Sequence, residues 1–142
     1  MRYLCDANLM WCQFDNSAPD QAYIWANIDQ LVARGNTVYL SPQNLIEFHG
    51  LATRPLENNG LGYSAADARV MAREIKTFFP LLPDTPEVYE KWCWLMDNYE
   101  VRGRQVHDAR LVAVMLANRV SHILTRNGAD FRRYREITVV EL

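Results

Sequence analysis

The sequence predicts an α/β fold, a three-layer α/β/α sandwich with a central parallel sheet, and three observations support this prediction. Short apolar segments alternate with longer segments whose apolar residues recur at helical spacing. A capping residue followed by proline, as in Ser41-Pro42, marks a helix start directly after a strand-like segment. The sequence has no internal repeats, and 142 residues suffice for one core. A single domain over residues 1–142 is therefore expected.

Two strands and their flanking helices are expected in the first half of the chain. The first strand covers Arg2 to Asp6, and a short apolar helix at Leu9 to Phe14 follows it. A longer helix begins at Pro19-Asp20 and stops at Gly35. Three further elements come after the second strand, Thr37 to Leu40: the helix that starts at Ser41-Pro42, the loop Arg54 to Tyr63, and the helix Ser64 to Phe78.

The second half is expected to complete the sheet. Phe79 to Leu82 is a candidate third strand, which Pro80 and Pro83 restrict to a short segment or an edge. The remaining expected elements are a helix from Thr85-Pro86 to about Tyr99, a helix over 108–119, a strand at His122 to Thr125, a turn at Asn127 to Asp130 with a short helix to Tyr134, and a last strand at Ile137 to Val140. Trp92 and Trp94 lie two apart and cannot both face one core, so one of them is either a contact for a partner or an exposed tryptophan without that role.

Composition excludes several classes of protein. The chain is 49% hydrophobic and 23% charged, which is typical of folded globular proteins. An acid at position 6 interrupts the apolar start before a signal peptide can form, and no apolar run reaches transmembrane length. The three cysteines lack CxxC spacing and indicate neither a disulfide framework nor a zinc ribbon. A cytoplasmic location is expected.

Charge is distributed unevenly along the chain. Residues 1–101 hold 7 Lys or Arg and 13 acids, whereas residues 102–142 hold 8 Arg and 4 acids. Arginine has a planar fork of donors that suits phosphate, so this segment could track a phosphate backbone. An arginine-rich solvated surface explains the same count, and only an acidic metal site beside these arginines would favour the first interpretation.

Four acids stand where an α/β sheet could bring them together: Asp6 after the first strand, Glu47 in the helix after the second, Asp108 near a helix start, and Asp130 after a late strand. Each has an ordinary alternative. Asp6 could satisfy loop amides, Glu47 could be a solvated helix residue, Asp108 could be an N-cap and Asp130 could bond its own turn. The ordered set of four is what favours a shared site.

The segments around these acids resemble those of the PIN-domain ribonucleases, and among them the VapC-type toxins of toxin–antitoxin pairs. The matching segments are Leu4-Cys5-Asp6-Ala7-Asn8, Asn44-Leu45-Ile46-Glu47-Phe48, His107-Asp108-Ala109 and Leu124-Thr125-Arg126-Asn127-Gly128-Ala129-Asp130-Phe131. Order and spacing agree over almost the whole chain. The resemblance implies a PIN-like strand order 3-2-1-4-5 with the acids at the carboxyl ends of the strands. It also implies a homodimer that binds a small antitoxin protein across the active-site groove.

Phosphodiester hydrolysis explains why such a fold would gather carboxylates. A divalent cation polarises the phosphate and activates water, and Mg²⁺, with Mn²⁺ as a substitute, prefers oxygen ligands. Asp6 and Asp108 are the expected direct ligands. Glu47 would act through a bound water or orient the nucleophile, and Asp130 would hold a second metal or a metal-bound water. Asn8, Thr125 and Asn127 are expected to support these acids through hydrogen bonds.

One part of the resemblance leaves alternatives open. Many PIN-domain relatives carry an acid close to the position of Asn127, whereas here the acid of that turn is Asp130. Either residue could fill the fourth position of the site. The number of bound metal ions, one or two, stays open with it.

The sequence thus predicts a Mg²⁺-dependent endoribonuclease that leaves 5′-phosphate and 3′-hydroxyl ends, with Arg102, Arg104 and Arg126 as candidate RNA-phosphate contacts. One alternative is a PIN-like RNA-binding or scaffold module that has lost catalysis, although all four acids are present. The other is a receiver-like phosphate-handling α/β domain. A receiver needs an acceptor Asp after a central strand and a Lys after a later one, and here Ser41 and Arg126 occupy those places.

Overall fold

A computed structural model describes residues 1–14 and 19–142, and within them one parallel sheet forms the centre of the molecule. Its strands are β1 (Arg2–Cys5), β2 (Thr37–Tyr39), β3 (His122–Thr125) and β4 (Thr138–Glu141), in the order β2-β1-β3-β4. Every neighbouring pair is parallel. The expected α/β class and the parallel sheet are confirmed.

The expected third strand at Phe79 to Leu82 is reduced to a single bridge. Leu81 pairs with Leu40 in parallel, at the outer edge of β2. The Leu40 amide donates to the Pro80 carbonyl at 3.0 Å, and the Leu82 amide donates to the Leu40 carbonyl at 2.7 Å. Prolines at 80 and 83 have no amide to donate, so the ladder cannot extend in either direction. The bridge nevertheless gives this segment the outermost place that the order 3-2-1-4-5 requires.

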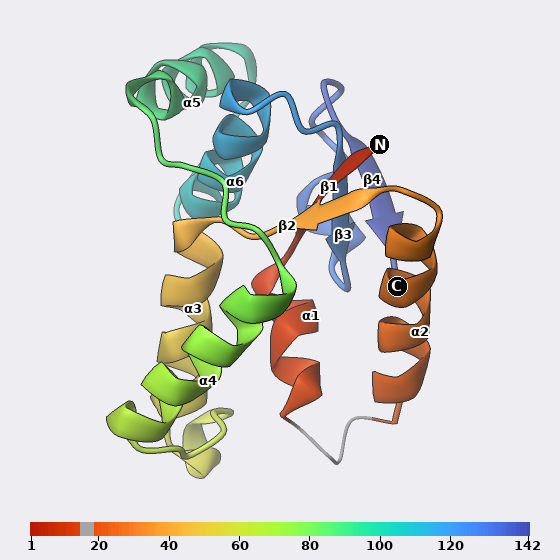
Figure 1. Ribbon diagram of the computed structural model, residues 1–142. Coiled ribbons are helices and arrows are strands. Elements are labelled where there is room, and N and C mark those ends of the chain that lie inside the picture. The colour runs from red at the N-terminus through yellow and green to blue at the C-terminus, as the bar shows by residue number, and fades with distance from the viewer. Residues whose placement is uncertain (15–18) are drawn as a thin grey trace.

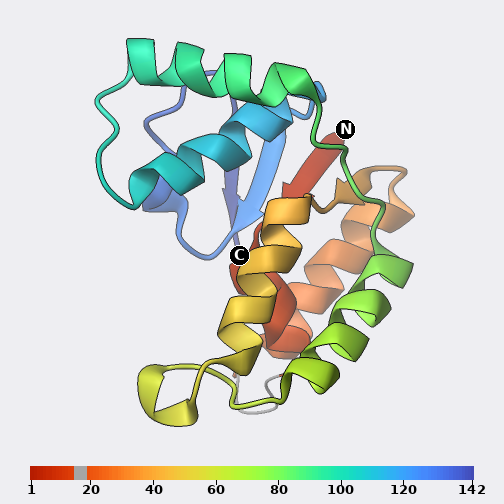
Figure 2. The same ribbon diagram turned by 90° about the vertical axis from the view of Figure 1, so that its left-hand side faces the viewer.

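Helices cover both faces of the sheet (Figures 1 and 2). One side carries α1 (Ala7–Met10), α2 (Gln21–Ala33), α3 (Pro42–Thr53) and α4 (Ala65–Phe78), and the other carries α5 (Pro86–Asn98) and α6 (Gln105–Ala117). Short 3₁₀ helices lie at η1 (Trp11–Gln13), η2 (Leu56–Asn58) and η3 (Gly128–Asp130). Figure 2 shows α5 and α6 side by side over their face, and both views show α3 beside α4. The three layers of the sandwich are therefore present.

Alternating side chains of the central strands feed two hydrophobic clusters. In β1, Tyr3 and Cys5 join the cluster under α2, α3 and α4, whereas Leu4 joins the cluster under α5 and α6. In β3, Leu124 and Ile123 divide in the same way. Successive residues of a strand point to opposite faces of the sheet. Because this sheet is buried on both faces, the sequence of each central strand contains a continuous run of apolar residues.

Capping at the start of α3 fixes the helix that carries Glu47. The Ser41 hydroxyl accepts a hydrogen bond from the Asn44 amide at 3.2 Å, and the Asn44 side chain accepts from the Ser41 amide at 2.8 Å. This reciprocal capping box satisfies amide groups that a helix end leaves open. The predicted helix start at Ser41-Pro42 is confirmed, and Glu47 lies one and a half turns into the helix.

The helix α6 differs from its expected bounds. It begins at Gln105, three residues before the expected start, and its N-cap position is Arg104. The interpretation of Asp108 as an N-cap is therefore wrong, because Asp108 lies inside the first turns of the helix. No helix within residues 1–14 and 19–142 is long and apolar enough to cross a membrane.

Candidate active site

One cleft at the carboxyl edge of the sheet gathers all four acids that the sequence singled out. Its volume is about 440 Å³, and its lining includes Asp6, Glu47, Asp108 and Asp130. Asp6 directly follows β1, and Asp130 ends the 3₁₀ helix that follows β3, while Glu47 comes from α3 and Asp108 from α6. Asn8, Arg126 and Asn127 line the same cleft. Because all strands are parallel, their carboxyl ends meet at this one edge.

Asp6 is the most enclosed of the four acids, with 7% of its surface exposed. Its backbone amide donates to the Leu124 carbonyl at 2.9 Å and continues the β1–β3 ladder by one residue. Its side-chain oxygen Oδ2 accepts a hydrogen bond from the Thr125 hydroxyl at 2.8 Å. Asp6 is therefore fixed at both backbone and side chain.

Thr125 is the residue that ties this part of the site together. Its hydroxyl donates to Asp6, and it accepts from the Asn8 side-chain amide at 3.3 Å and from the Asn127 backbone amide at 3.0 Å. Asn8 in turn accepts from the Arg126 backbone amide at 3.3 Å. The hydroxyl uses its donor and both acceptor sites in this network. The structure places Asn8 and Thr125 in the supporting positions that the sequence predicted, and it uses the backbone of Asn127 rather than its exposed side chain.

Glu47 is positioned by Gln43, a residue that the sequence pattern did not single out. The Gln43 side-chain amide donates to Glu47 Oε1 at 2.8 Å and to the His107 carbonyl at 2.7 Å. The Gln43 oxygen accepts from Arg110 at 3.0 Å. Gln43 therefore joins α3 to α6 and holds Glu47 beside the start of α6. Its place four residues before Glu47, on the same helix face, is the signal that could have found it.

Asp108 and Asp130 are less constrained. Asp108 is partly exposed, and Asp130 is exposed on the 3₁₀ helix η3, where its backbone amide donates to the Asn127 carbonyl at 3.1 Å. Asp130 lies in the 3₁₀ turn through its backbone, and its side chain is part of the cleft lining. The cleft thus has two firmly held acids and two that can adjust.

The carboxylates disfavour one another's charge. Burial raises the pKa of Asp6 to about 6, and the charges of Glu47 and Asp130 add to the rise, while the Thr125 hydrogen bond opposes it. Burial also raises the pKa of Asp108 to about 6, with further contributions from Asp130 and Asp6. The Glu47 side chain reaches solvent, but its partial burial raises its pKa. The hydrogen bond from Gln43 lowers this pKa, and the negative charge of Asp108 raises it. Such mutual repulsion is relieved when a cation binds between the groups.

The donor set fits a hard divalent cation. Its side chains offer carboxylate and amide oxygens, which Mg²⁺ and Mn²⁺ accept readily, and the cleft has room for the water molecules that Mg²⁺ retains. Within residues 1–14 and 19–142, no three acidic, histidine or cysteine side chains converge closely enough to hold an ion as they stand. The four acids therefore line one cleft without converging on a single point.

The three arginines singled out as phosphate contacts have different positions. Arg126 lines the acid cleft and pairs with Asp20 at 2.8 Å. Arg104 lines an adjoining hollow of about 520 Å³ together with Glu47 and Asp108. Arg102 is exposed, pairs with Glu100 at 2.8 Å and lines neither of these two hollows. Two of the three therefore border the acids.

Solved structures with the same architecture are complexes and toxins of toxin–antitoxin systems. VapBC2 from Rickettsia felis, bound to a promoter DNA fragment, matches with a TM-score of 0.74 and 16% identity, covering 100% of this chain and 99% of the matched chain. FitAcB from Neisseria gonorrhoeae matches with a TM-score of 0.66 and 16% identity, covering 98% and 96%. Mycobacterium tuberculosis VapC20, described as a sarcin-ricin loop cleaving toxin, matches with a TM-score of 0.59 and 17% identity, covering 85% and 86%.

No protein-family profile matches the chain, and no curated protein matches it either. The structural likenesses are at low identity and show the fold: this chain has the architecture of VapC-type PIN-domain toxins.

Proposed function

We propose that this chain is a ribonuclease toxin of a toxin–antitoxin pair, which hydrolyses RNA phosphodiester bonds with the help of Mg²⁺ or Mn²⁺. The observation that carries the proposal is the meeting of Asp6, Glu47, Asp108 and Asp130, from four separate segments, around one cleft of a VapC-type fold. The solved neighbours include antitoxin complexes and an RNA-cleaving toxin, which supports the same partner class and substrate class here. A homodimer is part of the proposal.

Asp6 and Asp108 would hold the cation, with Glu47 and Asp130 contributing through bound water. When bound, a divalent cation polarises the phosphate and lowers the pKa of an attacking water. Thr125 and Asn8 keep the Asp6 carboxylate in place, so the ligand does not have to be ordered during the reaction. Their hydrogen bonds are made before substrate arrives.

Glu47 is the residue best suited to accept a proton. Gln43 engages its Oε1 oxygen, which leaves Oε2 available to a water in the cleft. Glu47 lines both the acid cleft and the adjoining hollow of Arg104, so a water bound in either would lie beside it. Glu47 would therefore take a proton from the attacking water or from a water bound beside it.

Arg104 and Arg126 would balance the charge of the RNA backbone. Both border the acids, and a guanidinium binds phosphate through paired hydrogen bonds. Because binding through such contacts releases counterions, RNA affinity should fall steeply as salt rises.

A catalytically inactive RNA-binding module is the second candidate. All four acids line one cleft, which suits the binding of a divalent cation and the activation of water. A binding module has no use for that arrangement, so the nuclease is favoured.

The test is RNA cleavage by the purified chain with Mg²⁺, Mn²⁺ or EDTA, followed by the same assay on Asp6→Asn. We expect cleavage only with metal, and a loss of about a thousand-fold or more in Asp6→Asn, equivalent to several kcal/mol of transition-state stabilisation. Asp29→Asn is the matched control, because Asp29 is an exposed acid of α2 that does not line the cleft. Unchanged cleavage by Asp6→Asn would refute the proposal.

A further inference from the structure

An aromatic hollow lies between α5 and α6, lined by residues from the first part of each helix and from the segment just before α5. Its volume is about 450 Å³, and its lining includes Val88, Tyr89, Trp92, Val106, His107 and Arg110. Most of this lining is apolar, with one guanidinium at its border. None of these residues belongs to the acid cleft.

The aromatic hollow neighbours the acid cleft through a hollow that lies between them. The hollow that contains Arg104 shares His107 with the aromatic hollow and shares Glu47 and Asp108 with the acid cleft. We call these three neighbouring hollows the trough. Along it the lining changes from carboxylates to a guanidinium and then to aromatic rings.

Tyr89 and Trp92 form a prepared stacking surface at the end of this trough. Their ring centroids are 6.0 Å apart and their planes differ by 17°. The Trp92 indole is fixed by its Nε1–H, which donates to the Val106 carbonyl at 2.9 Å. Tyr89 is 70% exposed, so its ring contributes little to the core and is open to a ligand.

Arg110 is held at the border of the same surface. Its guanidinium bonds to the Gln43 oxygen at 3.0 Å and pairs with Asp84 at 3.2 Å. These contacts fix the guanidinium in the lining of the aromatic hollow, where Asp84 balances part of its charge. The combination of stacked rings and guanidinium groups along a trough is the one that proteins use to bind single-stranded nucleic acid.

We propose that the Tyr89–Trp92 hollow is a base-stacking subsite, which takes an unpaired nucleobase flanking the phosphate that the acids cleave. The proposal rests on the proposed ribonuclease function and adds a substrate requirement to it. A base must leave its helix to stack on a side chain, so the RNA must be single-stranded at this position. The contact reads the flat face of the base and is tolerant of sequence.

A nucleobase is favoured over a protein side chain as the occupant because of where the hollow lies. It neighbours the hollow of Arg104, which in turn neighbours the acids, so an RNA chain held at the acids and at Arg104 would have its next nucleotides beside the aromatic pair.

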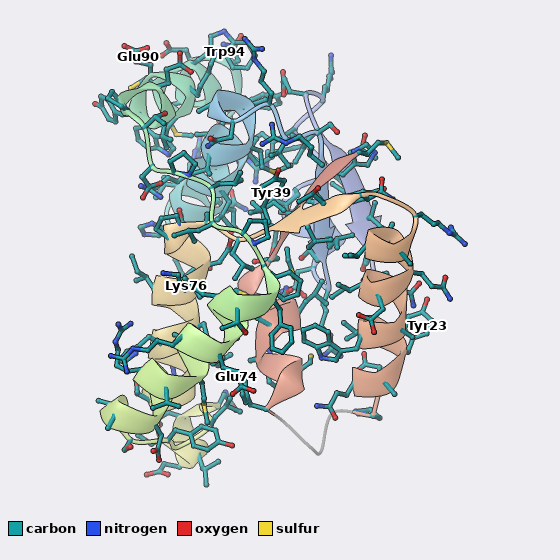
Figure 3. The ribbon with its side chains drawn as sticks, viewed as in Figure 1. Tyr23, Tyr39, Glu74, Lys76, Glu90 and Trp94 are labelled. Atoms are coloured by element: carbon teal, nitrogen blue, oxygen red, sulfur yellow. The ribbon has the colours of Figure 1, made fainter. Side chains whose placement is uncertain are left out.

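The test measures binding of fluorescein-labelled, random-sequence single-stranded RNA by anisotropy in EDTA, where no cleavage occurs. Tyr89→Ala should weaken binding about 5- to 100-fold, the range of one lost base–aromatic stack. Tyr89→Phe should recover most of that loss. Tyr23→Ala is the matched control, since Tyr23 is a 60% exposed tyrosine on α2, on the opposite side of the molecule from α5 with its Glu90 and Trp94 (Figure 3).

A second arm uses an oligomer of abasic ribose phosphate, which carries the backbone without bases. Wild type and Tyr89→Ala should bind this oligomer equally. With Mg²⁺ and base-bearing RNA, Tyr89→Ala should raise KM by a similar factor while kcat changes little.

Two results separate the subsite from the proposed function. If wild type cleaves RNA and Tyr89→Ala binds and cleaves equally well, or changes only self-association of the chain, the subsite is refuted alone. If wild type neither binds nor cleaves any RNA, the ribonuclease proposal fails and the subsite fails with it.

Discussion

The four acids of the cleft are held in two different ways. Asp6 and Glu47 accept side-chain hydrogen bonds from Thr125 and Gln43. Asp130 is exposed on a short 3₁₀ helix, where its backbone amide donates to the Asn127 carbonyl, and Asp108 is partly exposed. Asp6 and Glu47 form a rigid half that would define where a cation sits, and Asp108 and Asp130 form a compliant half that would adjust to it. The predictions below test this division, from the largest expected effect to the smallest.

The first prediction compares two carboxylates across the cleft. Asp108→Asn should reduce RNA cleavage about a thousand-fold, because it removes a proposed direct ligand. Asp130→Asn should cost only about ten-fold, in the range found for groups that act through a bound water or ligand. Cleavage rates at saturating Mg²⁺ measure both. Equal losses would show that the turn acid is a ligand of the same rank as Asp108, and its proposed action through a bound water would be wrong.

The second prediction concerns the hydroxyl that fixes Asp6. Thr125→Val leaves Asn8 and the Asn127 amide without their acceptor in a buried place, so unfolding free energy should fall by about 1–3 kcal/mol. Affinity for Mn²⁺ should fall about 10- to 100-fold. Urea unfolding and metal titration provide the measurements.

Two variants provide the contrast for that prediction. Thr125→Ser keeps the hydroxyl and should stay close to wild type in metal affinity. Asn127→Ala should change stability by less than about 0.5 kcal/mol, since its exposed side chain can be lost while its backbone amide remains. A larger effect at Asn127 than at Thr125 would reverse the assignment of the rigid half.

The third prediction is a pH dependence of the metal-free protein. The pKa values of Asp6 and Asp108 are raised to about 6 in the folded state, above about 3.9 for an unfolded aspartate. The folded chain therefore binds more protons between about pH 4 and pH 6, and its stability falls as pH rises through that window. For the enclosed Asp6 the loss is on the order of 2 kcal/mol, and for the more exposed Asp108 it is smaller because solvent screens the charge.

Melting temperature against pH, with and without Mg²⁺, checks this prediction. In EDTA the melting temperature should decrease from pH 5 to pH 7.5 as far as these two groups determine it. Mg²⁺ or Mn²⁺ should restore it at pH 7.5. Asp6→Asn should flatten the slope and abolish the response to metal, whereas Asp29→Asn should preserve both.

The fourth prediction tests the link between α3 and α6. Gln43→Ala frees Glu47 and breaks the bonds to His107 and Arg110, so kcat should fall about ten-fold with a stability loss of about 1 kcal/mol. Kinetics and thermal unfolding of the same preparation separate the two effects. An unchanged kcat would show that Glu47 needs no positioning.

Much of the fold could be predicted from local patterns in the sequence. Apolar strand segments, the Ser41 cap and the alternation of elements depend on near neighbours in the sequence, and the structure agrees with them. The two departures depend on more distant or weaker signals. The start of α6 has no capping side chain at Arg104, so the sequence holds no local signal for it. The segment around Pro80 forms a bridge because the amide and carbonyl of Leu40, about forty residues earlier in the chain, bond to it.

The candidate site shows the same limit. Its four acids could be named from their places after strands and in helices, and parallel strand ends bring them together. Gln43 could not be assigned a role, because two of its three partners, His107 and Arg110, are more than sixty residues away and depend on how α3 meets α6. The sequence pointed to the region of the aromatic hollow only through the two-residue spacing of Trp92 and Trp94, which cannot both face one core. Trp94 is 44% exposed, while Trp92 is fixed by Val106, a pairing that needs the packing of α5 on α6.

The hydrogen bond between Thr125 and Asp6 has a consequence for the order in which this chain is made. It joins residues 119 positions apart, across the pairing of β1 with β3. A ribosome that has synthesised the first hundred residues has produced Asp6 and Glu47, but neither the strand that orders Asp6 nor the helix that carries Asp108. The proposed nuclease site would therefore be complete only after α6 and β3 have been synthesised. The nascent chain would remain harmless to the RNA that surrounds it until β3 has left the exit tunnel and paired with β1.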